Sequence, residues 1–278
     1  RLGENMKIDT RLLTNLLKRT QRHQHVAGKA QPQVQSTILY AKEDRVTTTN
    51  LVRDGKTSLS VFRLPAETDG TVLIPIADID KALGILSAHG SPVSVTLDYD
   101  RVVFKSGRKT TRLISSIDGT AFLHGQETIQ EWSRKSDELA NKFVFDDNEF
   151  KGYTMRDGSL HEPLTTITVD CNEFYDALKA DSINNQKLNR YQLAVKDGVI
   201  RIGVGDEMKG FTFTDLEHES KGIETFEWTF EGGLDNVMFG LGGTCQIHFL
   251  DFRELNQGMR IVIDFGEAGW VYQAGIIE

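Results

Sequence analysis

The chain has 278 residues, enough for one large domain or two of ordinary size, and its 39% hydrophobic and 26% charged residues are typical of a globular protein with a sizeable core. Its net charge of −8 excludes a uniformly basic surface, although a local basic patch could still bind nucleic acid. No apolar run approaches the roughly 18 residues of a membrane-spanning helix, and residues 1–5 lack the apolar core of a secretory signal, so we expect Met6 to be the natural start of a protein that is neither secreted nor bound to a membrane.

A single pattern, strand–helix–three strands, runs four times along the chain, and such repeats are a strong clue to architecture. The predicted elements of the first pass are a helix at 10–23, capped by Asp9 or Thr10, and strands at 37–41, 46–52 and 57–64. Those of the second pass are a strand at 71–76, a helix at 78–89 and strands at 92–98, 101–106 and 109–115.

A polar segment at 117–164 separates the second pass from the third. The predicted elements of the third pass are a strand at 165–169, a helix from Asn172 as its cap to about 180, and strands at 191–195, 199–204 and 209–215. Those of the fourth pass are a strand at 225–230, a short helix at 234–241 and strands at 244–250, 259–265 and 270–277. The sequence therefore predicts two pairs of similar units.

The first helix has two chemically distinct faces. Its apolar face consists of Leu12, Leu13, Leu16 and Leu17. At about 100° per residue, the basic residues Arg11, Lys18 and Arg22 fall on one narrow stripe on the opposite side. Helix surfaces are usually charged, so an ordinary solvated face is one interpretation, and a surface that attracts phosphates is the other.

The segment 117–164 breaks the rhythm of the repeat and is interpreted as a connector between two domains. It contains the apolar pair Phe122-Leu123, a helix predicted around 128–141, and the acidic run Asp146-Asp-Asn-Glu149. A structureless loop of this length is unusual in a compact domain, so we expect the connector to have some structure of its own. The acidic run could hold a hard cation, but without EF-hand spacing a solvated linker is favoured.

The patterns of catalytic sites are missing from the sequence. Gly203, Gly205 and Gly210 lie between strands rather than before a helix, so a glycine-rich turn with strand ends is preferred to a dinucleotide loop. His23 and His25 are expected to be surface or cap residues rather than metal ligands. No nucleophile elbow or P-loop occurs. We expect neither enzymatic activity nor a cofactor or metal.

The two cysteines, Cys171 and Cys245, lie far apart in the sequence and have no metal-binding spacing. So few cysteines are typical of a protein in a reducing compartment. We expect both to be small core residues rather than a disulfide bridge.

Several segments, taken in this order, resemble the DNA sliding clamps. The segment 170–178, followed by 193–202, resembles the opening of a clamp's second domain, and 101–114 resembles the strand pair that ends the first. The last residues, 270–278, resemble the C-terminal strand and tail of proliferating cell nuclear antigen. Two domains in one chain are similar to the trimeric clamps of eukaryotes, archaea and T4-like phages, whereas bacterial clamps have three domains and form dimers. The divergence of these segments suggests a viral or phage member.

The resemblance implies an α+β clamp fold. Clamp domains would occupy 6–116 and 165–278, joined by the connector at 117–164, with helices lining a ring and antiparallel sheets outside. It also implies a homotrimer that encircles double-stranded DNA, is placed there by a clamp loader, and tethers DNA polymerase and other replication proteins through short peptides. The protein would act in the cytoplasm of a bacterial host or in a eukaryotic nucleus.

The resemblance assigns roles to particular residues. The basic residues expected to face DNA are Arg11, Lys18 and Arg22, with Lys81, Lys179, Lys187 and Arg190 as weaker candidates. Such residues would touch the backbone of DNA and not its bases, so no sequence preference is expected. The fourth helix departs from the pattern, because its outer side offers Asp235 and Phe239 and no base.

Two further surfaces follow from the resemblance. Ring closure would pair the strand 109–116 of one subunit with 209–215 of its neighbour. The interface residues would be Lys109, Thr111, Leu113, Lys209, Phe211 and Phe213. The partner-peptide pocket would have Tyr272 and Ala274 as its floor and Val46, Phe122 and Leu123 as its walls.

Two other functions remain open on the sequence alone. The first is a clamp-like factor that does not encircle DNA, or a subunit of a heteromeric ring; a basic outer sheet or failed self-association would favour it. The second is a β-rich structural protein of a virion, which would assemble but ignore DNA.

Overall fold

The computed structural model describes residues 5–24, 35–52, 58–99, 101–114, 122–123, 127–179, 190–206, 210–221, 225–231 and 234–276. These residues form two compact units. The first comprises the described residues up to Leu51 together with those of Ser60–Glu138, and the second comprises the remainder, chiefly the described residues from Leu139 onward. The segment predicted as a connector is therefore divided between the units. Among the described helices, none is long and apolar enough to cross a membrane.

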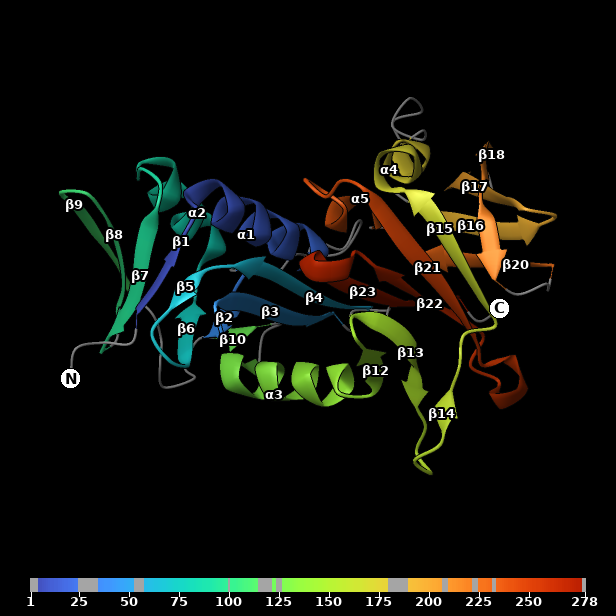
Figure 1. The fold of residues 1–278 in the computed structure, drawn as a ribbon, viewed down its shortest axis with the longest axis horizontal. Coiled ribbons are helices and arrows are strands. Elements are labelled where there is room, and N and C mark those ends of the chain that lie inside the picture. Colours follow the sequence, from blue (N-terminus) through green and yellow to red (C-terminus); the bar gives the residue numbers. More distant parts are fainter. Residues whose placement is uncertain are drawn as a thin grey trace. The chain divides into compact units, whose positions relative to one another are not determined.

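The first unit contains two groups of strands and two packed helices, as Figure 1 shows. One group has the order β5 (Glu67–Thr68), β1 (Asn5–Ile8), β7 (Val93–Asp98), β8 (Arg101–Ser106) and β9 (Lys109–Ile114). The other has the order β6 (Val72–Ile76), β2 (Thr37–Lys42), β3 (Arg45–Val52) and β4 (Ser58–Pro65). The helices are α1 (Thr10–Gln24) and α2 (Ile79–Ser87). A short pair, β10 (Phe122–Leu123) and β11 (Glu127–Thr128), leads to α3 (Ile129–Ala140).

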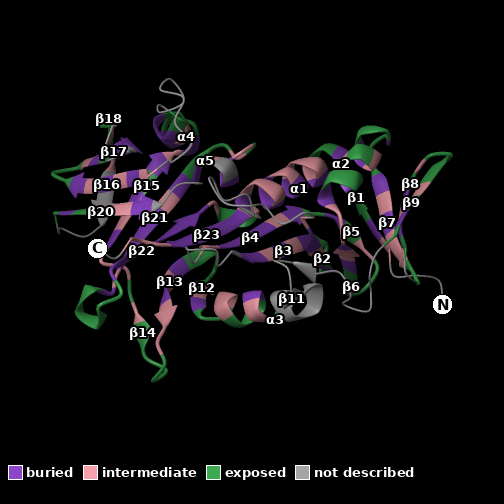
Figure 2. Ribbon diagram, turned by 180° about the vertical axis from the view of Figure 1, so that it is seen from behind, coloured by how far each residue is buried: buried purple, intermediate pink, exposed green. Residues whose placement is uncertain are grey.

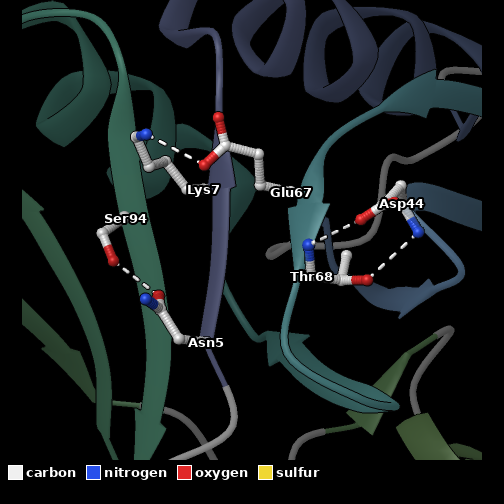
Figure 3. A network of polar contacts seen from close by, with 6 residues as sticks. All are labelled: Asn5, Lys7, Asp44, Glu67, Thr68 and Ser94. Atoms are coloured by element: carbon white, nitrogen blue, oxygen red, sulfur yellow. Dashed lines mark hydrogen bonds and ion pairs between the residues drawn. The ribbon is translucent and has the colours of Figure 1, made fainter.

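Polar contacts attach β5 to the outer side of β1 (Figure 3). The Lys7 ammonium lies 2.9 Å from the Glu67 carboxylate, and Asp44 and Thr68 exchange two hydrogen bonds between a turn and β5. On the other side of β1, the Ser94 hydroxyl donates to Asn5 Oδ1. The short β5 and the longer β9 are therefore the two edge strands of this sheet.

The second unit is also built from two groups of strands and two helices. One group has the order β19 (Glu219–Lys221), β15 (Thr165–Asp170), β21 (Thr244–Asp251), β22 (Met259–Asp264) and β23 (Gly269–Ala274). The other has the order β18 (Gly210–Glu217), β17 (Val199–Asp206), β16 (Arg190–Lys196) and β20 (Phe226–Glu231). The helices are α4 (Cys171–Lys179) and α5 (Leu234–Val237), and two 3-10 turns cover Arg253–Leu255 and Gly266–Ala268.

A small three-stranded sheet precedes the third of the four repeated units. Its strands are β12 (Phe143–Asp146), β13 (Glu149–Thr154) and β14 (Leu160–His161), and we call this segment, 143–161, the insert. It lies on the side of β21–β23 opposite to α4 (Figure 1). The acidic run is exposed to solvent, as predicted, but it belongs to the β12–β13 hairpin rather than to a linker. Asp147 and Asn148, both at positive φ, make the tight turn between β12 and β13, because such two-residue hairpins need two left-handed residues.

The strands and helices predicted from the sequence occur in the predicted order, and their boundaries shift by a few residues at most outside α5 and the last strand. The strands β1, β5, β10–β14 and β19 were not predicted. Helix α1 is capped by Asp9, whose Oδ1 accepts from the Leu12 amide at 3.0 Å. The predicted Asn172 cap of α4 is wrong. Asp170 takes this role, since its Oδ1 accepts from the amides of Asn172 and Glu173, and the helix begins at Cys171.

The core of each unit lies between its helices and its strands, and Figure 2 shows the buried positions alternating along the strands. In α1, the side chains of Leu13, Leu16 and Leu17 are fully buried, which matches the predicted apolar face. Cys171 and Cys245 are buried and free, so the prediction that they are core residues without a bridge is confirmed.

Candidate nucleic-acid interface and partner surfaces

The solvent side of α1 carries the predicted basic stripe. Arg11 is exposed, and Lys18 and Arg22 are half-buried. The side chains at these three positions lie on the face away from Leu13, Leu16 and Leu17, which are fully buried. The leucines hold the helix against the strands, so the stripe is presented by a rigid element and can attract phosphates.

The flank of α1 that turns inward has two features that the sequence did not predict. Arg19 is only 5% exposed, its guanidinium lies 5.3 Å from the centre of the Phe62 ring, and burial lowers its pKa to about 10. His23 is also buried and lies 3.1 Å from the Ser60 hydroxyl, and burial lowers its pKa to about 3. The expectation that His23 is a surface or cap residue is wrong, and His25 lies outside the described residues. His23 is neutral at pH 7.

Helix α2 offers a weaker cationic surface than α1. Lys81 is exposed, but its ammonium lies 3.2 Å from the carboxylate of Asp78, the residue that caps the helix. The neighbouring Asp80 is also exposed and accepts a hydrogen bond of 2.6 Å from Gln21 of α1. Two acids therefore surround the single base of this helix.

The helices of the second unit are of mixed charge. In α4, Lys179 is exposed and lies over the Tyr175 ring at 4.4 Å, and the exposed acids Glu173 and Asp176 share the same helix surface. In α5, Asp235 accepts a hydrogen bond of 2.6 Å from the Tyr191 hydroxyl. As the sequence indicated, Asp235 gives this helix an acid and no base.

The two remaining weaker candidates for DNA contact are Lys187 and Arg190. Lys187 lies outside the described residues. Arg190 begins β16, and strand alternation puts its side chain on the face opposite to the buried Tyr191, which contacts α5 through Asp235. Arg190 therefore lies on the face of its sheet that is away from α5.

Both strands predicted to close a ring are edge strands. Strand β9 is the last strand of its sheet in the first unit, and β18 is the last strand of its sheet in the second. An edge strand presents unpaired amide and carbonyl groups and is ready to accept a further strand. In each case the described strands leave one such edge open.

The predicted interface residues of β9 are engaged within the first unit. Lys109 donates to the Ala88 carbonyl at 2.7 Å, Thr111 lies 2.9 Å from His89 Nε2, and Leu113 is 7% exposed. The alternate positions of the strand are open to solvent, including Arg112 and Ile114. The accessible face of β9 is therefore shifted by one residue from the prediction.

The two aromatic interface residues predicted on β18 lie opposite glycines of the neighbouring strand. Phe211 and Phe213 stack with ring centres 6.1 Å apart, opposite Gly205 and Gly203 of β17. A Cβ on Gly203 would come within 2.7 Å of the Phe213 ring, so only glycine leaves room for it. Gly203 and Gly205 lie near the end of β17 and Gly210 begins β18, which agrees with the predicted strand ends, and residues 207–209 between them lie outside the described part of the structure. Lys209 lies outside the described residues.

The insert covers the predicted floor of the peptide pocket. Tyr272 is 2% exposed, and the centre of its ring lies 4.9 Å from that of Phe143. Phe143 also contacts Trp270 at 4.8 Å, and Phe145 contacts Trp270 at 5.4 Å. This burial raises the pKa of Tyr272 to about 12. Tyr272 therefore presents no surface to a partner in this structure.

The other predicted pocket residues are not brought together as one accessible surface. Val46 is fully buried in β3, and Ala274 is half-buried. Phe122 and Leu123 form β10, and their side chains lie outside the described part of the structure. A cavity of about 450 Å³ lies instead beside the C-terminal strand, where its lining includes Trp228, Arg253 and Ile276. Among the described residues, no cluster of three acids, cysteines or histidines could hold a metal ion.

Comparison with solved structures identifies the architecture. The chain aligns over 99% of its length with the DNA polymerase sliding clamp of Bacillus subtilis (15% identity, TM-score 0.65) and with the proliferating cellular nuclear antigen of Entamoeba histolytica (11% identity, TM-score 0.63). A third match is the Helicobacter pylori beta clamp bound to a DNA ligase peptide, with 13% identity over 99% of this chain and a TM-score of 0.58. Neither family models nor curated proteins match the sequence.

The matches differ in how much of the other protein is covered. The chain spans 65% of the Bacillus clamp and 67% of the Helicobacter clamp, but 99% of the Entamoeba protein. The fold is therefore that of the DNA sliding clamps, and the chain has the length of the Entamoeba protein.

Proposed function

We propose that this protein is a DNA sliding clamp, a processivity factor without enzymatic activity that encircles duplex DNA and tethers a polymerase. The observation that carries the proposal is the basic stripe of α1 on a clamp fold that aligns with the whole length of a proliferating cellular nuclear antigen. A ring holds DNA by topology, so three weak, backbone-directed cations per subunit suffice for sliding contacts.

The proposed assembly is a homotrimer of two-domain subunits, with domains at 6–116 and 165–278. Heterologous contacts that close on themselves make a ring, and the open edges of β9 and β18 are suited to such a contact. A clamp loader would open and close this ring on DNA. Monomeric or heteromeric clamp-like factors are the alternative function, and they predict that the protein alone does not form a ring.

Partner proteins would bind through short peptides beside the C-terminal strand. Because the insert covers Tyr272, we assign the entry point to the cavity that Trp228, Arg253 and Ile276 line. Its mixture of an aromatic surface with a few polar groups suits a peptide that inserts apolar side chains.

The first test is the absolute mass in solution by light scattering over a concentration series. A ring of three 31.2 kDa chains has a mass of about 94 kDa. Retention on nicked circular DNA, and its loss when the DNA is cut to a linear form, would then support encirclement. A monomer at every concentration, or equal retention on circular and linear DNA, would refute the proposed ring.

A further inference from the structure

Another cavity lies in the first unit, at one end of the five-stranded sheet that contains β1. Its volume is about 680 Å³, and its walls are the end of β1, the segment that leads into β7, and the hairpin between β8 and β9. The bases that line it are Lys7, Lys105, Arg108 and Lys109. Among the described residues that line this cavity, none is acidic, and we call it the basic groove.

The sheet fixes the spacing of these bases. Lys7 pairs with Ser94 and Ser94 pairs with Lys105, so the two lysines lie on one face of the sheet, two strands and about 10 Å apart. Gly107, with a φ of 54°, is the first residue of the tight turn between β8 and β9 and puts Arg108 at the tip. The bases of the groove are therefore held by paired strands and a tight turn.

Most of the positive charge of the groove is not cancelled by an acid. The Lys7 ammonium lies 2.9 Å from the Glu67 carboxylate, as Figure 3 shows, so this pair is neutral. Lys109 donates to a backbone carbonyl at 2.7 Å, which leaves its charge in place. In the part of the chain that the structure describes, the exposed side chains of Lys105 and Arg108 make no hydrogen bond or ion pair. The groove therefore offers the charges of Lys105, Arg108 and Lys109 to a ligand.

The groove begins beside the N-terminal end of α1. The hydroxyl of Ser91, which lines the groove, accepts from the amide of Thr10 at 3.2 Å and donates to Asp9 at 2.9 Å. Thr10 is the first residue of α1, and Arg11, the first base of the stripe, follows it. Asp9 is the acid at this junction, and both of its carboxylate oxygens already accept hydrogen bonds, from α1 and from Ser91. A phosphate chain that follows the stripe would thus reach the groove next.

The lining of the groove favours a nucleic acid over a peptide. Peptides are held by apolar pockets or by a free strand edge, but β1, β7 and β8 are paired on both sides, and the described lining consists of glycines, serines and bases with the single proline Pro92. A nucleic-acid backbone needs cations alone, and an arginine such as Arg108 can bind one phosphate through two parallel hydrogen bonds. A flexible single strand can place successive phosphates in a concave surface, whereas a duplex is stiff and convex.

We propose that the basic groove binds the phosphate backbone of single-stranded DNA, at a site separate from the stripe of α1. The choice of partner rests on the proposed function, because a clamp on a primed template has a single strand next to the duplex that it holds. Contacts to the backbone carry no sequence preference. None of the described lining residues is aromatic, so the bases of the strand are not stacked on the protein and binding depends strongly on salt.

Fluorescence anisotropy of a short, linear oligothymidine over a salt series tests the groove. Lys105→Ala/Arg108→Ala should weaken binding by more than about tenfold at a salt concentration of about 50 mM, and should lower the slope of log affinity against log salt by about 1.4, or about 0.7 for each lost phosphate contact. The matched control, Lys42→Ala/Lys196→Ala, removes two exposed strand bases outside the groove and should change neither value. Thermal unfolding checks that both variants are folded. Equal oligothymidine binding by the two variants would overturn the proposal.

Three further ligands test the choice of partner. A short polyglutamate peptide should compete poorly with the oligothymidine, and equal competition at equal charge would overturn the assignment to a nucleic acid. A short linear duplex should bind less tightly than the single strand, and tighter binding of the duplex would overturn the assignment to a single strand. Retention of Lys105→Ala/Arg108→Ala on nicked circular duplex DNA should be unchanged, because topology and α1 hold that DNA, and its loss would refute a separate site.

The outcomes separate this inference from the proposed function, because binding of a short oligothymidine does not require a ring. If the unaltered protein is a monomer at every concentration, but Lys105→Ala/Arg108→Ala alone loses oligothymidine binding, the ring is refuted and the groove stands. If the protein forms a ring on circular DNA, but the groove variant binds oligothymidine as well as its control does, the ring stands and the groove is refuted.

Discussion

The helices of the two units follow one structural plan but differ in electrical character. Helix α1 has bases alone along its solvent side, at Arg11, Lys18 and Arg22. Helix α4 mixes Lys179 with exposed acids, and α5 presents Asp235. Among the described helices of this chain with a net charge of −8, α1 therefore has the most cationic solvent side. In the proposed ring, DNA contact would come mainly from the first unit of each subunit.

Reversing the charge of the basic stripe is expected to have the largest effect on DNA binding. The triple variant Arg11→Glu/Lys18→Glu/Arg22→Glu should lose retention on circular DNA and stimulation of the polymerase, because the attraction between each subunit and the phosphates becomes repulsion. If all three residues contact phosphates, the slope of log affinity against log salt should fall by about 2.7 per subunit. The measurement is DNA binding over a salt series.

A matched control separates the stripe from net charge. Lys42, Lys105 and Lys196 are exposed bases on strands, and their replacement by Glu changes the charge by the same amount. These variants should keep most of the retention on DNA. Equal losses in both triple variants would mean that overall charge, and not α1, controls binding.

Removal of an aromatic ring of the insert is expected to have the largest effect on stability. Phe143 is 6% exposed and contacts Trp270 and Tyr272 of the second unit. Phe143→Ala should lower the free energy of unfolding by about 3 kcal/mol, as large-to-small changes of buried aromatic residues do. Phe145, which is half-buried, provides the control, and Phe145→Ala should cost less. Denaturant titration of both variants measures the difference, and equal small losses would mean that the insert is not packed on the sheet.

The order of elements could be predicted because it depends on local patterns. The leucines of α1 recur at helical spacing, and Asp9 lies where a cap is needed. The open edges at β9 and β18 also followed from the repeat and the resemblance. These features need only residues that are near in sequence, or a topology common to a family.

The features that the sequence did not predict depend on contacts between residues far apart in the sequence. Phe143 and Phe145 alternate as in a strand, but their partner Trp270 lies at the far end of the chain, so the insert was interpreted as part of a connector. His23 was expected to be a surface or cap residue, and the burial of Arg19 was not predicted. Their burial depends on Phe62 and Ser60 of β4, which no helical pattern reveals.

The two units can also be compared through one strongly buried histidine in each, His23 and His248. Burial lowers the pKa of His23 to about 3 and that of His248 to about 4, from an ordinary value of 6.5. Below pH 6.5 the unfolded chain binds a proton that the folded chain refuses, so stability is lost as pH falls towards these values, by up to about 1.4 kcal/mol per pH unit for each histidine. His23→Asn should flatten the fall of stability between pH 6 and pH 3, and His248→Asn should do so between pH 6 and pH 4. Urea midpoints over this range measure both slopes, and unchanged slopes would contradict the neutral buried state.

The smallest expected effect concerns the acid that distinguishes α5 from α1. Tyr191→Phe removes the hydrogen bond to Asp235 while leaving the buried ring in place. Because Asp235 is only half-buried and water can replace the lost donor, the cost should be about 1 kcal/mol. Asp235→Asn, which keeps an acceptor for Tyr191 and removes the charge, should cost less and should strengthen DNA binding slightly if α5 faces the phosphates. Unchanged DNA affinity in Asp235→Asn would place α5 away from DNA.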